Sequence, residues 1–144
     1  MSNSNKPGIA FWIIGIIALL WNGMGVNTYL QMAFKTEAST AGLNAEQIAM
    51  MNDTPAWLTA LFAIAVFSGI IASILFLMRK KIAVTLFVIS FVAATIQHLY
   101  WMFGTNASEV YADMQPYLMP TIVIVLGAFW VWFSKNQQAK GILA

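Results

Sequence analysis

Four stretches of the chain contain no Asp, Glu, Lys or Arg and are dominated by apolar side chains. They cover residues 7–34, 54–78, 82–108 and 114–134. A helix rises about 1.5 Å per residue, so roughly 20 apolar residues cross the hydrocarbon layer of a membrane. Backbone groups must be paired within lipid, and continuous apolar runs without strict alternation favour helices over a barrel. The pattern therefore predicts four membrane-spanning helices.

Capping residues and prolines place the ends of these helices. The expected spans are residues 9–34, 55–78, 82–104 and 116–134. Thr54-Pro55 is typical of a helix start, and the short connection Arg79–Lys81 makes its two flanking helices antiparallel neighbours. Between the first two spans, Asn44 and Gln47 have the spacing of a capping box, which predicts a short amphipathic helix that ends near Met51. Residues 1–144 are thus expected to form one membrane domain, an all-α four-helix bundle with up-down-up-down topology.

Most basic and all acidic residues lie at opposite ends of the expected bundle, and this distribution predicts its orientation in the membrane. Six of the seven basic residues lie at one end of the expected bundle, at Lys6, Arg79, Lys80, Lys81, Lys135 and Lys140. All five acidic residues lie in the other two loops. The positive-inside rule then places both termini in the cytoplasm. Because the basic residues flank the spans and form no separate patch, we expect membrane lipid and no nucleic acid as a partner.

Polar side chains within the spans concentrate in the outer half and predict an outward-facing pocket. Its hydrogen-bonding groups would be Asn22, Asn27, Gln97 and His98, and its aromatic walls Trp21, Tyr29 and Trp101. A second interpretation is structural, because amide and imidazole groups in membrane bundles commonly bond across helices, typically adding under about 2 kcal/mol each. Both interpretations stay open for Asn22 and His98.

The sequence lacks the residues that several classes of chemistry require. The spans contain no Asp, Glu, Lys or Arg, and His98 is the one side chain in them that titrates near neutrality. The chain has no cysteine, and a single histidine cannot ligate haem on both sides or complete a metal site. We therefore expect no enzymatic activity, no cofactor, no metal and no pump driven by a buried acid.

Several short motifs together resemble a known family. They are Trp21-Asn22-x2-Gly25-x3-Tyr29-Leu30, Pro55-Ala56-Trp57, Ala63-Ile64-Ala65-Val66-Phe67-x-Gly69, Arg79-Lys80 and Met119-Pro120. In order and spacing they resemble small four-span bacterial inner-membrane proteins that are often labelled "sugar transporter". The resemblance covers nearly the full chain. It implies a multi-pass protein of the bacterial inner (plasma) membrane and brings no established functional residues with it.

The sequence leaves three functions open. The first is transport of a neutral polar solute such as a sugar, because amides suit hydroxyl groups and aromatic faces suit sugar rings. Four helices are few for a transport path, so this function implies a homodimer, with the stripe Ala65, Gly69 and Ser73 as its contact. The second function is that of a non-transporting structural or accessory membrane protein. The third is binding of a lipophilic ligand such as a quinone or a lipid.

Overall fold

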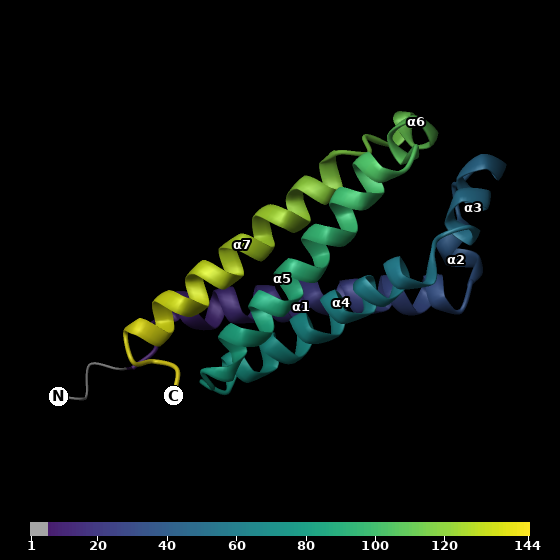
Figure 1. Ribbon diagram of the computed structural model, residues 1–144. Coiled ribbons are helices and arrows are strands. Elements are labelled where there is room, and N and C mark those ends of the chain that lie inside the picture. Colours follow the sequence, from purple (N-terminus) through teal and green to yellow (C-terminus); the bar gives the residue numbers. More distant parts are fainter. Residues whose placement is uncertain (1–5) are drawn as a thin grey trace.

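The computed structural model describes residues 6–144, and within these residues every regular element is a helix (Figure 1). Four helices are long and apolar enough to span a membrane. They are α1 (Ile9–Ala33), α4 (Ala56–Leu77), α5 (Ile82–Leu99) with its π-helical continuation η1 (Tyr100–Gly104), and α7 (Leu118–Ala139). This confirms the predicted all-α four-helix fold of a multi-pass membrane protein.

The loops carry shorter helices. These are α2 (Glu37–Thr40), α3 (Ala45–Asn52), α6 (Ala107–Val110) and the 3-10 turn η2 (Ala112–Met114). The predicted capping box of α3 is present, because the Asn44 side chain accepts from Gln47 N at 2.8 Å and Gln47 Oε1 accepts from Asn44 N at 3.1 Å. The short helix in the first loop is therefore where the sequence placed it.

The last long helix differs from its predicted bounds. It continues to Ala139, past the expected end at Ser134, because no residue between them interrupts helical hydrogen bonding. The chain reverses at Gly141, whose φ of +75° is readily adopted by glycine. Ile142 N then donates to Gln137 O at 3.0 Å. The final residues therefore fold back toward the bundle.

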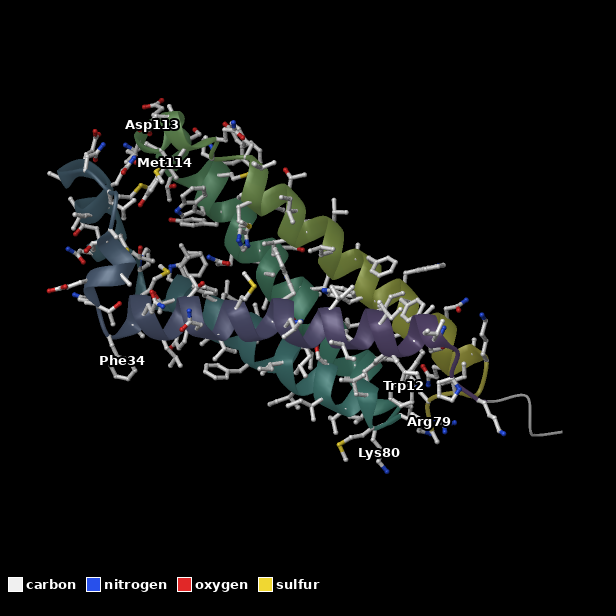
Figure 2. The ribbon with its side chains drawn as sticks, turned by 180° about the vertical axis from the view of Figure 1, so that it is seen from behind. Trp12, Phe34, Arg79, Lys80, Asp113 and Met114 are labelled. Carbon is white, nitrogen blue, oxygen red and sulfur yellow. The ribbon has the colours of Figure 1, made fainter. Side chains whose placement is uncertain are left out.

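Neighbouring long helices pack in chain order, α1 on α4, α4 on α5 and α5 on α7. Figures 1 and 2 show the four helices close together at one end and separating toward the other as two pairs, α1 with α4 and α5 with α7. The converging end carries the start of α1, the end of α7 and the connection Arg79–Lys81, and we call it the basic end (Figures 1 and 2). The opposite end carries the loops 34–55 and 105–117 with all five acidic residues, and we call it the acidic end.

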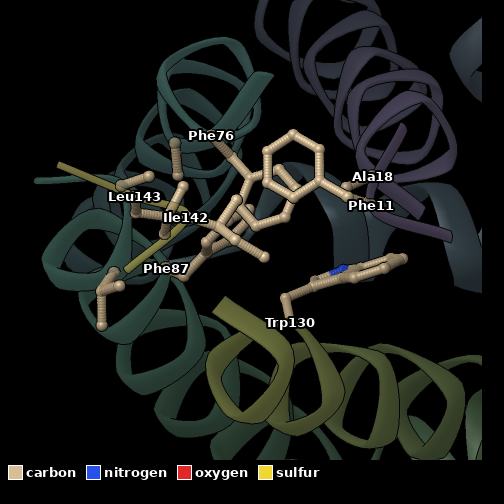
Figure 3. Close-up of a cluster of buried hydrophobic side chains, with 10 residues drawn as sticks. Phe11, Ala18, Phe76, Phe87, Trp130, Ile142 and Leu143 are labelled. Carbon is tan, nitrogen blue, oxygen red and sulfur yellow. The ribbon is translucent and has the colours of Figure 1, made fainter. Parts of the chain in front are cut away.

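The largest apolar cluster lies in the basic half (Figure 3). Phe11 of α1 stacks on Phe76 of α4 with ring centroids 4.3 Å apart, and Phe87 of α5 and Trp130 of α7 complete the cluster. All four long helices thus contribute to one packed core. Burial of a large apolar side chain stabilises by about 1.5–3 kcal/mol in water-soluble proteins, whereas within lipid the gain comes mainly from close packing.

The chain's last residues close this core from the basic end. Ile142 and Leu143 are buried in the cluster, and Ala144 N donates to Arg79 O at 2.9 Å. Lys81 N donates to Ala144 O at 3.0 Å, and Arg79 Nε donates to Ile142 O at 3.0 Å. We call this set of bonds the tail contact. It ties the end of α7 to the α4–α5 connection.

Candidate functional site

Asn22 lies where three helices meet near the middle of the bundle. Its Nδ2 donates to Ala18 O at 2.8 Å and to Ser73 Oγ of α4 at 3.3 Å. A Cβ added to Gly69 would lie 2.1 Å from Asn22 Oδ1 and 3.0 Å from Ser90 Oγ of α5. Gly69 therefore leaves the space that the Asn22 amide occupies. We call Asn22, Gly69, Ser73 and Ser90 the Asn22 contact.

The small-residue stripe on α4 packs inside the chain. Ala65, Gly69 and Ser73 are all buried, and Ser90 Oγ of α5 donates to Ala65 O at 2.6 Å. The expectation that this stripe forms the contact of a homodimer is therefore wrong, because α1 and α5 already cover it. A homodimer itself stays a prediction and would use another surface.

The other predicted residues of α1 do not gather around Asn22. Tyr29 packs edge-on against Phe62 and Phe67 of α4, with ring centroids 5.7 Å and 5.6 Å away. Trp21 is half-buried, whereas Asn27 is exposed on the helix surface. The Tyr29 ring thus contributes to the packing of α1 against α4.

Unsatisfied hydrogen-bonding groups occur on α5 in the acidic half. His98 is half-buried, and its Nδ1 lies 2.8 Å from Ala94 O one turn earlier, so Nδ1 donates there. Gln97 Oε1 and Thr95 Oγ1 are buried and have no hydrogen-bond partner among residues 6–144. The third such atom, Trp130 Nε1, lies in the basic half. Buried polar atoms are nearly always paired, so a group left without a partner requires an explanation.

A π-helical turn and a layer of aromatic rings follow these residues. The rings of Trp57 on α4 and Tyr100 on η1 lie 4.7 Å apart, and those of Trp101 and Tyr111 lie 5.4 Å apart. A Cβ on Gly104 would lie 2.8 Å from Tyr100 Cδ2, so glycine leaves room for the Tyr100 ring. π-Helical turns are frequent at functional sites. This aromatic layer connects the two helix pairs next to the acidic-end loops.

The two acidic-end loops are joined by a contact that the sequence reasoning missed. Gln47 of α3 is buried, and its Nε2 donates to Val110 O at 3.1 Å and to Asp113 Oδ1 at 3.3 Å. Tyr111 OH donates to Gln47 O at 3.2 Å. Burial raises the pKa of the Tyr111 phenol above its usual value. We call these bonds the loop contact.

A signal for the loop contact was present in the sequence. The capping box uses only Oε1 of Gln47, so its Nε2 was left to find a partner elsewhere. The sequence could not identify that partner, because it lies in the other loop, 63 residues further along the chain.

Two hollows of the described chain lie in the basic half, and neither is lined by any of the seven predicted residues. The smaller, about 10 Å³, lies in the core beside Gly15, Phe76 and Trp130. The larger is a groove between the start of α1 and the end of α7. The predicted outward-facing pocket stays a prediction, and the groove at the basic end is a hollow that the sequence did not indicate.

Within residues 6–144 there is no cluster of His, Asp or Glu side chains that could hold a metal ion. Comparison of the chain with protein families, curated proteins and solved structures found no match.

Proposed function

We propose that the protein binds a small neutral polar solute, such as a sugar, in the acidic half of the bundle and carries it across the membrane. The observation that carries this proposal is the buried Gln97 Oε1, which has no hydrogen-bond partner among residues 6–144. Leaving a buried polar atom unpaired costs about 1–3 kcal/mol, which a solute hydroxyl group would recover. The spans carry no Asp, Glu, Lys or Arg, and this favours an uncharged solute.

The aromatic layer supports the choice of a sugar-like ligand. Trp57, Tyr100 and Trp101 lie close to the acidic end, and Tyr100 directly extends the helix that carries Gln97. Aromatic faces pack well against the apolar faces of sugar rings, while amide groups bond to the hydroxyl groups at their edges. Hydrogen bonds and a stacking surface would therefore both be available to one solute.

The loop contact supports entry from the acidic end. At that end the two helix pairs are far apart in both views, and Gln47 joins their loops through side-chain hydrogen bonds (Figures 1 and 2). Breaking these bonds and the contact between the Trp57 and Tyr100 rings costs less than separating the aromatic core of the basic half, to which all four long helices contribute. We infer that the acidic-end loops open first and that transport requires a later separation of the basic-end core.

Solute uptake by purified protein in lipid vesicles tests this proposal. Vesicles would be offered a panel of radiolabelled neutral sugars and polyols, with protein-free vesicles as the baseline. We expect Gln97→Leu to lower uptake at least tenfold, because the substitution removes the amide and keeps a similar volume. Gln138→Leu is the matched control, since Gln138 is an exposed amide at the basic end, and it should leave uptake unchanged.

Two results would contradict the proposal. If the unchanged protein takes up none of the neutral solutes, transport of such solutes is excluded as its function. Uptake that is equal in Gln97→Leu and Gln138→Leu would remove Gln97 from the site.

A second candidate function is that of an accessory membrane protein, and the Asn22 contact favours it. The Nδ2 hydrogen bonds of Asn22 are made within the bundle, so this amide contributes to helix packing. If packing is its whole role, Asn22→Ala lowers thermal stability, and a defined partner protein co-purifies with the unchanged chain. Measured uptake of a solute by the protein alone would exclude this candidate.

A further inference from the structure

The groove at the basic end has the chemistry of an anion site. It is an open groove of about 650 Å³ between the start of α1 and the end of α7. Its polar lining consists of Lys6, Lys140, Asn136 and Gln137, and Phe11 and Phe133 line its apolar part. The residues come from both ends of the described chain, so the fold brings them together.

Positive charge is concentrated at this groove. Lys6 precedes α1 and Lys140 follows α7, and among residues 6–144 no acidic residue lines the groove. All five acidic residues of the chain lie in the loops of the acidic end, the length of the bundle away. The two ammonium groups therefore have no competing carboxylate side chain in the groove.

Backbone and amide donors add to these charges. Gly8 and Ala10 line the groove at the start of α1, and Gly8 caps the helix without a side-chain hydrogen bond. The first turn of a helix has free N–H groups and a partial positive charge, which favour a bound anion. Gln137 lines the same groove and is only 6% exposed, and its Nε2 makes a long bond of 3.3 Å to Asn136 Oδ1. Residues with three kinds of donor group thus line one hollow.

We propose that this groove binds the phosphate group of an anionic phospholipid. A lipid is favoured over a free anion by exposed apolar side chains, because Trp132, which lines the groove, is 61% exposed, and Ile9 at the start of α1 is 78% exposed. Both residues belong to membrane-spanning helices near their basic ends, where headgroups meet acyl chains. The phosphate would lie among the lysines, and the acyl chains would cover the adjoining faces of α1 and α7. Basic pockets between membrane helices are a recurrent form of headgroup site.

Lipid binding to the purified protein tests the proposal independently of any transport. Native mass spectrometry would follow titration with phosphatidylglycerol and, separately, with phosphatidylcholine. We expect clear preference for phosphatidylglycerol, and we expect the double variant Lys6→Gln/Lys140→Gln to weaken its binding at least tenfold. Near a membrane surface each lysine contributes about 1 kcal/mol, and tenfold corresponds to about 1.4 kcal/mol.

The matched control is Lys80→Gln/Lys135→Gln. It removes the same charge from exposed lysines at the same end but outside the groove, and should weaken binding less than about threefold. Equal weakening in the two double variants would overturn the groove as the site. Displacement of the lipid by inorganic phosphate at equal concentration would overturn the lipid as the ligand. All four lysines are exposed, so unchanged thermal unfolding of both variants verifies that the fold is intact.

Discussion

The basic and acidic halves of the bundle are held together by different interactions. In the basic half, rings from all four long helices pack in one core, and the tail contact closes its end. In the acidic half, two helix pairs separate, and their loops are joined by the hydrogen bonds of Gln47 and Tyr111. Separating a core of large packed side chains costs more free energy than breaking a few hydrogen bonds. The comparison indicates that stability resides in the basic half and adaptability in the acidic half.

The Asn22 contact lies between these two regions and marks the change from one to the other. Toward the basic end from Asn22, the inward positions of α1 are Ala18, Gly15 and Phe11, all buried. Toward the acidic end, α1 buries no further residue completely and packs on α4 through the half-buried ring of Tyr29. The Asn22 contact thus marks the point on α1 beyond which no further residue of that helix is buried.

The largest expected effect comes from the core of the basic half. Phe76→Ala removes a ring that contacts Phe11, Phe87 and Phe133, and should lower the free energy of unfolding by about 3–5 kcal/mol. Trp57→Ala is the comparison in the acidic half, where the ring is 48% exposed, and should cost less than half as much. Unfolding in mixed detergent, followed by circular dichroism, measures both. Equal losses would contradict the difference between the halves.

An intermediate effect is expected at the boundary. Gly69→Ala places a methyl group 2.1 Å from the present position of Asn22 Oδ1, and the displaced amide should cost about 1–3 kcal/mol of unfolding free energy. Gly23→Ala is the matched control, because its Cβ would meet only Ile70 Cδ1 at 3.9 Å, an ordinary contact. The same unfolding assay applies. A control variant as unstable as Gly69→Ala would show that general crowding, and not Asn22, is responsible.

The smallest effect concerns the loop contact and pH. The neutral Tyr111 phenol donates to Gln47 O, and the ionised form cannot. Because burial raises the pKa of Tyr111 above 10.0, its stabilisation is fully present below that pH and is lost as pH rises through the folded-state value. Hydrogen exchange of the α3 amides should therefore accelerate in that alkaline range beyond the intrinsic rate. Tyr111→Phe should remove this additional step, and its persistence in the variant would assign it to another group.

The sequence predicted the helices well because membrane spans leave a strong one-dimensional signal. Charge-free runs, Thr54-Pro55 and the Asn44 capping box are all local, so the number of long helices and the presence of α3 followed directly. The end of α7 was placed too early, because polar residues after Ser134 indicate where the membrane ends and not where the helix ends.

The site was harder to predict, because it depends on which neighbour each helix face meets. Asn22 and Gln97 were grouped by depth alone, but the Nδ2 bonds of Asn22 go to α1 and α4, while Gln97 Oε1 on α5 has no partner in the described chain. The depth of a side chain in the membrane follows from counting residues along the helix. The neighbour toward which the Asn22 side chain points depends on how α1 packs against α4. In the basic-end groove Lys6 and Lys140 line the same hollow, and no local sequence pattern indicates that they do.

The π-helical turn η1 affects how related sequences should be aligned with this chain. A π turn holds about one residue more than an α turn, and one residue of α-helix corresponds to about 100° of rotation. Because the wider turn takes up the additional residue, deleting one residue between Tyr100 and Gly104 would leave an α turn, and the chain that follows would keep nearly the same direction. In an alignment, a single gap at this place therefore signifies a narrower helical turn and not a redirected loop.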